Sequence, residues 1–525
     1  MRKITYTFLA FMLVTSLHLY SQSEMDALKF SRSGLYGTAR SMGMGGAFGA
    51  LGGDMTGVSI NPAGIGVYRS SEIAGTFGLQ SNNSKVGDIK NRANDFNMHN
   101  FGFVGYFPLR NETMPLINFG FAHNRHNSFN KTVGAAGSGV GTMMDYMAER
   151  SSGVDREKLF MGKDLPDPFL SQDWLSVLGF NSWLIDGKKN ADGKYVYSPL
   201  NTNGDNPFQE IKTYERGYID NYDFTIGTTI SDVLNIGVSL NLTDLYHYID
   251  TEFLEDFDDG TKIKGGYTLG NNVITKGSGI GAKLGLIYRP IHELRLGVAY
   301  HTPVVYSLTE SYDAYLDDDM GAYIADPDYE KGVTSSARFS NYYDLRTPSK
   351  WVFSAASVLG SNFILSADYE LTDYRNMKLK VPAGASNQSF YDYDNQYISE
   401  DFKVTSTLRL GAEYRFNQQL SARLGYAWMQ NPFNSDFLSD GNPGVSGSNT
   451  IFRIEGDSNY YTAGLGYRFT KEFYVDLAMV YQTQKDDLYP FPNVYNDAGN
   501  LLIDAAPFEL KNNSVRGIIT LGYKF

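Results

Sequence analysis

The chain has 525 residues, no cysteine and a formal net charge of −13, which becomes −15 if Arg2 and Lys3 leave with a signal peptide. The lack of cysteine excludes disulfides, thiolate metal sites and a cysteine nucleophile, and the acidic balance argues against a nucleic-acid partner. Tyrosine (38), phenylalanine (33) and glycine (54) are abundant, yet the mean hydropathy is −0.31. This composition suits a membrane β-barrel, in which lipid-facing apolar residues alternate with polar lumen residues. A secreted soluble all-β protein has a similar composition and stays open at this point.

Residues 1–21 begin with two cations and continue with an apolar run from Phe8 to Val14. This pattern predicts a secretory signal peptide. No later stretch supplies the roughly 18 uncharged apolar residues that a transmembrane helix needs. We therefore expect an exported protein that can enter a membrane only as a barrel.

The next stretch, residues 40–68, holds nine glycines between Gly43 and Gly66 and closes on Asn61, Pro62, Ala63 and Gly64. Glycine permits close backbone approach and proline removes a hydrogen-bond donor, so a regular helix or central strand is excluded. We expect an irregular plug over residues 22–71, which ahead of a membrane barrel belongs in the lumen.

From Glu72 onward the chain alternates with period two, as where Val515, Ile519, Leu521, Tyr523 and Phe525 share one strand face. One apolar and one polar face predict lipid outside and a lumen inside. Short turns are expected after even-numbered strands and long loops after odd-numbered ones, the outer-membrane pattern. The barrel, residues 72–525, is predicted to have 14 antiparallel strands, at 72–80, 97–109, 115–127, 217–231, 234–252, 275–289, 293–309, 346–359, 362–380, 401–416, 419–430, 458–469, 472–486 and 512–525.

The glycine-rich segment with Asn61-Pro62-Ala63, followed by 14 strands, resembles the FadL/TodX (OmpP1) family of outer-membrane channels. The resemblance implies passive passage of long-chain fatty acids or other hydrophobic compounds, gated by the plug at Asn61, Pro62, Ala63 and Gly64. It also implies contact with outer-membrane lipid. The final strand ending in Phe525 resembles the signal that barrel-insertion machinery reads.

The longest predicted connection, residues 128–216, is long enough to be functional. Apolar residues at helical spacing predict short helices at 143–150 and 168–185, and two of the four tryptophans lie in the second. One interpretation makes Trp174, Phe180 and Trp183 an exposed landing site for a hydrophobic ligand. The other is that these helices only pack on the barrel mouth.

Six cations are predicted on the lumen face, namely Lys283, Arg295, Arg409, Arg423, Arg468 and Arg516. A turn centred on Gln418 would set Glu413 opposite Arg423 as an ion pair. Most of these cations are expected to pair with acids or contact the plug. Alternatively, Arg409 or Arg423 binds the carboxylate of a fatty acid, because a charge-assisted contact can fix a head group beside apolar walls.

No catalytic residues, metal ligands or cofactor are expected. Gly43, Gly45 and Gly46 lack the preceding strand of a dinucleotide-binding fingerprint, and His123 and His126 fall on opposite faces of a predicted strand. The predicted function is an outer-membrane channel for hydrophobic compounds. The alternative is a FadL-like barrel that serves as a docking component of a protein secretion or surface-attachment system. An apolar path continuous from the loops into the lumen would distinguish the channel.

Overall fold

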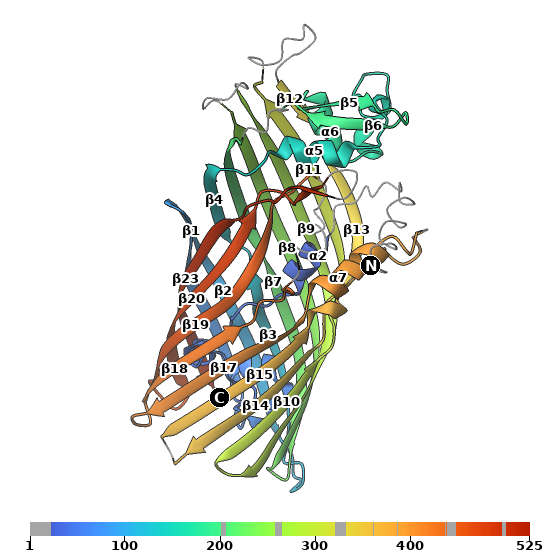
Figure 1. Cartoon of the computed structure of the whole chain (residues 1–525). Coiled ribbons are helices and arrows are strands. Elements are labelled where there is room, and N and C mark those ends of the chain that lie inside the picture. The colour runs from blue at the N-terminus through green and yellow to red at the C-terminus, as the bar shows by residue number, and fades with distance from the viewer. Residues whose placement is uncertain are drawn as a thin grey trace.

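The computed structural model describes residues 23–200, 206–257, 265–320, 332–360, 362–385, 387–435, 437, 448–495 and 500–525. The predicted signal peptide lies outside these residues. The wall is a closed antiparallel barrel of 14 strands, as predicted (Figure 1). It closes where β1 (Glu72–Val86) pairs with β23 (Phe508–Lys524). The other wall strands, in chain order, are β2 (Ile89–Pro108), β3 (Leu116–Ser128) continued by β4 (Lys131–Ser138), β7 (Phe208–Ile230), β8 (Leu234–Asp256), β9 (Gly266–Ile291), β10 (Leu294–His301) continued by β11 (Val305–Asp318), β13 (Phe339–Arg346) continued by β14 (Lys350–Leu359), β15 (Phe363–Asp373) continued by β16 (Lys378–Lys380), β17 (Val404–Arg415), β18 (Leu420–Met429), β19 (Phe452–Arg468) and β20 (Phe473–Tyr489).

The remaining elements are short and belong to the N-terminal segment or to the loops. The N-terminal segment holds α2 (Glu24–Ser31), α3 (Ala39–Gly43), α4 (Met55–Ile60) and the 3₁₀-helix η1 (Pro62–Val67). The loops hold α5 (Met143–Ser151), η2 (Arg156–Lys158), η3 (Pro168–Leu170), α6 (Trp174–Asn181), β5 (Ile185–Lys189), β6 (Tyr195–Pro199), β12 (Gly332–Ser335), η4 (Tyr374–Asn376), α7 (Asp392–Asp401), β21 (Val494–Tyr495) and β22 (Leu501–Ile503). None of the helices in the described residues is long and apolar enough to cross a membrane.

Two predicted connections are wrong. The first two strands were expected to be joined by a long loop, but β1 and β2 continue to a two-residue turn at Gly87 and Asp88, where Gly87 has a positive φ of 53°. The longest connection shrinks to residues 139–207, because β4 and the first part of β7 extend the wall. Both errors have one cause: the strands rise above the membrane, where outward residues are polar and the apolar alternation disappears although pairing continues.

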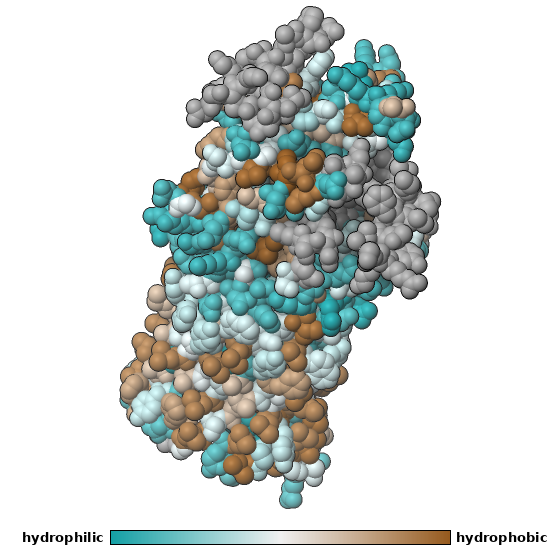
Figure 2. Space-filling model, viewed as in Figure 1, coloured by the Kyte–Doolittle hydropathy of each residue, from teal (hydrophilic) through white to brown (hydrophobic). Residues whose placement is uncertain are grey.

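Strand lengths and surface hydropathy show how far the barrel projects. β7, β8 and β9 have 23, 23 and 26 residues, whereas a tilted strand needs roughly 9–11 to cross a bilayer. Exposed apolar side chains gather around the lower part of the wall, and the surface above this band is mostly hydrophilic (Figure 2). The predicted aromatic rim is exposed at the lower end of the strands, with Tyr288, Phe416, Phe469 and Phe525 among its members.

Candidate ligand cavity and lumen plug

The N-terminal segment, residues 23–71, is the plug, and its lower part packs backbone to backbone on the wall. One close approach occurs where Gly411 on β17 lies opposite Gly425 on β18. A Cβ on Gly425 would lie 2.1 Å from the backbone nitrogen of Gly45, and a Cβ on Gly411 would lie 2.5 Å from the Met44 carbonyl oxygen. Only glycine leaves room for plug backbone at this pair.

The Asn61-Pro62-Ala63 tripeptide uses a second pair of this kind, Gly237 on β8 opposite Gly285 on β9. A Cβ on Gly237 would lie 2.2 Å from the Pro62 carbonyl oxygen, and one on Gly285 would lie 2.0 Å from Asn61 Oδ1. Asn61 Nδ2 donates to the carbonyls of Gly49 (2.8 Å) and Leu286 (3.1 Å), while its Oδ1 accepts from Ala63 N–H (3.1 Å). The tripeptide therefore ties plug to wall and caps η1, and Gly64 is buried behind it.

Buried polar contacts hold the plug on several sides of the lumen. Arg40 Nε lies 3.0 Å from Glu413 Oε2, and the Phe48 and Gly49 amides each donate to Asp368 Oδ2 at 2.9 Å. Further anchors run from Ala39 N to Thr520 Oγ1, Gly45 N to Thr462 Oγ1, Ser59 Oγ to Asp223 Oδ2 and Asn118 Nδ2 to Ile65 O. Satisfying these buried groups makes the seated plug a specific arrangement.

The predicted ion pair between Glu413 and Arg423 is present, with Arg423 Nε 2.7 Å from Glu413 Oε2. Arg423 Nη1 also lies 2.5 Å from Asp476, and Arg409 Nη2 lies 2.6 Å from Glu370 Oε2. The two arginines predicted to bind a ligand carboxylate are thus each satisfied by acids of the wall.

Three of the other four predicted lumen cations are also bound, either by an acid of the wall or by the plug. Lys283 pairs with Asp223 at 2.8 Å. Arg295 and Arg516 each donate to a plug carbonyl at 2.5 Å, those of Leu51 and Leu35. Arg468 is exposed at the lower rim instead. Pairing or plug contact, the first of the two interpretations, accounts for five of the six.

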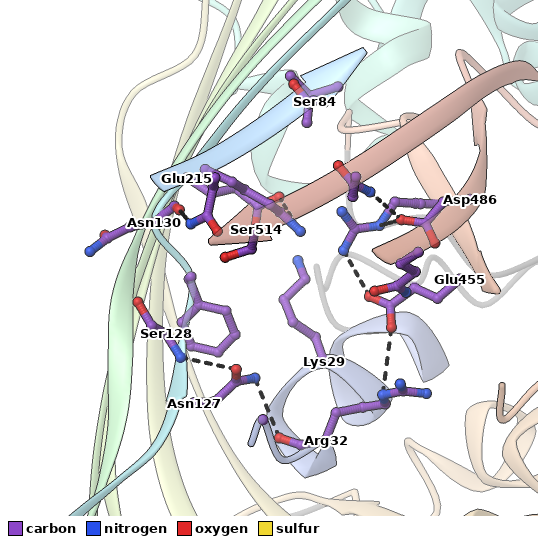
Figure 3. Close-up of a pocket in the computed structure, with 18 of the residues that line it drawn as sticks. Lys29, Arg32, Ser84, Asn127, Ser128, Asn130, Glu215, Glu455, Asp486 and Ser514 are labelled. Atoms are coloured by element: carbon purple, nitrogen blue, oxygen red, sulfur yellow. Dashed lines mark hydrogen bonds and ion pairs between the residues drawn. The ribbon is translucent and has the colours of Figure 1, made fainter. Parts of the chain in front are cut away.

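A cavity of about 270 Å³ lies above the lower plug, between α2 and the upper parts of β1, β4, β7, β19, β20 and β23. Lys29 projects into it from α2, between Glu215 on one side and Glu455 and Asp486 on the other (Figure 3). One part of its lining is polar, with Gln80, Asn82, Ser84, Asn127, Asn130, Gln482, Gln484, Asn512 and Ser514. The other part is apolar, with Leu28, Phe129, Val133, Phe452, Leu488 and Leu510.

The charges of the cavity form a connected network. Glu455 accepts from Arg453 at 2.7 Å and lies 3.5 Å from Arg32, and Lys131 lies 3.4 Å from Glu215. Five cations and four carboxylates line the space, namely Lys29, Arg32, Lys131, Arg453 and Arg516, and Asp26, Glu215, Glu455 and Asp486. The lining therefore carries one more cation than acids.

Burial and the arginines set the protonation of this network. Burial opposes ionisation of Glu455, but Arg453 and Arg32 outweigh it and lower the pKa of that carboxyl to about 2. Burial raises the pKa of Asp486, which Arg453 offsets only in part. Burial also lowers the pKa of Lys131. In both Asp486 and Lys131, burial thus disfavours the charged form.

The apolar side of the cavity belongs to a large buried cluster, called here the mouth cluster, that fills the upper barrel. It joins Leu28, Phe129, Val133, Phe452, Leu488 and Leu510 to Met143, Met147, Trp174, Leu178 and Phe180 of the long loop. Trp174 is 4% exposed and Phe180 7%, while Trp183 is 38% exposed. The prediction of an exposed landing site is therefore wrong for Trp174 and Phe180, because α5 and α6 fold against the barrel mouth.

Trp174 shows how the loop is fixed. Its Nε1 donates to the Phe169 carbonyl at 3.0 Å, and its ring lies 4.8 Å from that of Tyr312 on β11. The buried Glu255 on β8 accepts hydrogen bonds from Thr142, Met143 N–H, Gln209 and Tyr267, and so holds the start of α5 against the wall.

Sequence reasoning did not predict two cavity residues, Lys29 of α2 and Arg32, which caps the C-terminal end of that helix. Their only signal was a capping box at the start of that helix, in which Ser23 and Asp26 pair reciprocally. The described residues contain no group of three or more histidines, aspartates or glutamates placed to hold a metal ion.

Comparisons with known proteins agree with this geometry. Residues 265–515 match the family model described as "Outer membrane protein transport protein (OMPP1/FadL/TodX)". A 47 kDa outer membrane protein of Pasteurella multocida (strain Pm70) is 23% identical over 232 residues, 42% of this chain, and the match spans about half (49%) of that relative. The crystal structure of a Pseudomonas aeruginosa FadL homologue covers 94% of this chain and 99% of its own, with a TM-score of 0.53 and 14% identity, a likeness of fold. These findings agree with the resemblance inferred from the glycine-rich segment and the strand pattern: the chain is an outer-membrane β-barrel that is similar to the FadL/TodX family over residues 265–515 and has the fold of the FadL homologue.

Proposed function

We propose that the barrel carries hydrophobic molecules with a polar head passively across the outer membrane, with long-chain fatty acids as the substrate class. The ligand enters at the barrel mouth, reaches the cavity beside α2 and is retained there by the plug until the plug moves. The residues assigned to that movement are Asn61, Pro62, Ala63 and Gly64, which join plug to wall.

The observation that carries the proposal is the continuity of the mouth cluster. The same cluster contains Trp174 and Phe180 of the long loop and Leu28, Phe129 and Phe452 of the cavity wall. An alkyl chain that enters this cluster leaves no buried polar group unsatisfied, but the close-packed side chains must separate to admit it. A docking barrel that transports nothing does not need apolar continuity between the loop and the cavity.

The polar half of the cavity suits the head group. Its cations include Arg32 and Arg453, which share Glu455, and the partly buried Lys131. A carboxylate entering here would gain charge-assisted hydrogen bonds in a lining that already has one more cation than acids. Because the cavity of about 270 Å³ is slightly smaller than usual ligand pockets, roughly 300–1,000 Å³, we expect the chain of the ligand to extend upward into the mouth cluster.

Equilibrium binding of radiolabelled oleate to the folded, detergent-purified protein tests this function. We expect saturable binding, weaker binding of oleate methyl ester, and at least tenfold weaker oleate binding after Phe452→Gln, which puts an amide into the apolar wall. Leu502→Gln is the matched control, since Leu502 is 62% exposed on β22. No saturable binding by a folded barrel would contradict the proposal and favour the docking role.

A further inference from the structure

Four lysines stand side by side across the outer face of four neighbouring strands. Strand register sets Lys485 on β20 opposite Lys511 on β23, Lys511 opposite Lys85 on β1, and Lys85 opposite Lys90 on β2. All four are exposed and lie on the face turned away from the lumen. With strands about 4.8 Å apart, this lysine row is roughly 15 Å long.

Such a row costs stability in the isolated protein. Like charges directly opposite each other on adjacent strands repel. In the described part of the chain, Lys511 is the member with an ion pair, its Nζ lying 2.7 Å from Glu509 Oε1, and both groups are about half exposed. Exposed pairs of this kind contribute little. The barrel wall does not require the row, which points to an anionic partner outside the protein.

The row lies at a defined height above the apolar band. On the same strands the outward apolar residues end at Leu79, Phe96, Tyr481 and Val515, four to six residues below the lysines. With a rise of 3.3 Å per residue and a tilt of 35–45°, the row stands roughly 10–15 Å above the edge of the apolar band. This part of the wall is hydrophilic, above the brown lower band (Figure 2).

The surrounding charges are ordered along the membrane normal. Arg92 lies one rung below Lys90 on the outer face of β2, with its Nε donating to Asn83 Oδ1 at 3.0 Å. The acids Asp487 and Glu509 lie opposite each other one rung above the row. The cations thus face the membrane side and the acids the far side, as expected beside a negatively charged lipid surface.

We propose that the lysine row and Arg92 form a binding surface for the phosphate groups of the phosphorylated glycolipid in the outer leaflet of the outer membrane. The ammonium groups act as point charges that accept several phosphate positions, and the guanidinium of Arg92 adds planar, bidentate contacts. A glycolipid whose acyl chains lie against the apolar band presents its phosphates at this level. The surface lies outside the barrel, and its link to the ligand cavity is Asn83, which accepts from Arg92 and also lines the cavity.

The test is binding of purified bisphosphorylated lipid A to the full-length folded protein in amphipathic polymer. A Lys85→Gln/Lys90→Gln/Lys485→Gln/Lys511→Gln variant is compared with a control that removes four exposed lysines elsewhere, Lys163→Gln/Lys188→Gln/Lys212→Gln/Lys276→Gln. The overall charge change is therefore equal. Retained heat-modifiable gel mobility shows that both variants are folded, and lipid A stripped of phosphate and inorganic phosphate serve as the other probes.

We expect at least tenfold weaker lipid A binding by the row variant, near wild-type binding by the control, and binding by the wild type that falls with salt. Dephosphorylated lipid A should bind the wild type and the row variant equally weakly. Equal loss in both lysine variants, or no loss in either, would overturn the proposal. Equally tight binding of inorganic phosphate at the row would assign the site to free phosphate in place of the lipid.

Discussion

The contact between Gly425 and the plug gives the sharpest prediction. A Gly425→Ala substitution places a methyl group 2.1 Å from the backbone nitrogen of Gly45 and 2.3 Å from the Met44 carbonyl carbon. Real Cβ contacts stay above 3.0 Å, so the plug backbone must retreat by about 0.9 Å. That shift strains the hydrogen bond from Gly45 N–H to Thr462 Oγ1, which is 3.0 Å long.

Overpacking of this kind costs about 1–3 kcal/mol, which corresponds to a roughly 5- to 150-fold larger displaced population of plug. Hydrogen exchange at residues 43–53 should accelerate by this factor, and ion conductance in planar bilayers should rise. Gly517→Ala is the control, because no atom lies within 4 Å of its added Cβ. Exchange no faster in Gly425→Ala than in Gly517→Ala would refute the argument that wall glycines seat the plug.

Three further predictions follow from buried groups. Glu413→Gln removes the carboxylate shared by Arg40 and Arg423 and should lower the free energy of unfolding by roughly 3–5 kcal/mol. Arg415, which also pairs with Glu413, is 45% exposed, so Arg415→Gln should cost at most about 1 kcal/mol. Equal thermal unfolding temperatures of the two variants would contradict this prediction. Burial raises the pKa of Glu255 from 4.5 to about 7, so the folded state holds the proton of this carboxyl more tightly than the unfolded state does. The docking of α5 should therefore weaken as pH rises from 4.5 to 7, and hydrogen exchange in α5 should become faster over this range. Glu255→Gln should abolish this pH dependence. Trp174→Ala should cost about 3–5 kcal/mol and expose residues 139–207 to protease, while Trp183→Ala should not.

The wall could be predicted from the sequence because the alternation of apolar and polar residues is a local property of each strand. Lipid on one side and lumen on the other impose alternation on every strand, and all 14 predicted strands are present. The register of β17 and β18 was also predictable, since a short turn fixes which residues stand opposite, and Glu413 does face Arg423. Above the membrane the outward residues are polar and the alternation disappears, which is why the upper part of the β1–β2 hairpin was predicted as a loop.

The site could not be predicted in the same way, because it depends on contacts between segments far apart in the sequence. Arg409 and Arg423 were correctly placed on the lumen face, but their partners Glu370 and Asp476 lie on other strands. Trp174 and Phe180 would have the same helical spacing in an exposed landing site as in helices packed on the barrel mouth, so the spacing cannot distinguish the two interpretations. Whether their rings face solvent or Tyr312 depends on how the loop folds back, which periodicity does not report.

The position of α2 links the cavity to the plug. Lys29 and Arg32 line the cavity, and the Leu35 carbonyl three residues after Arg32 accepts from the buried Arg516. A ligand can shift the plug only if it binds the displaced state more tightly than the seated one. Under the proposed function, a ligand carboxylate that competes with Glu455 for Arg32 would meet that condition, because it would weaken a contact between α2 and the wall. Opening would then begin at α2 and reach the glycine contacts through Leu35, so we expect Arg32→Gln to accelerate hydrogen exchange in the plug even without ligand.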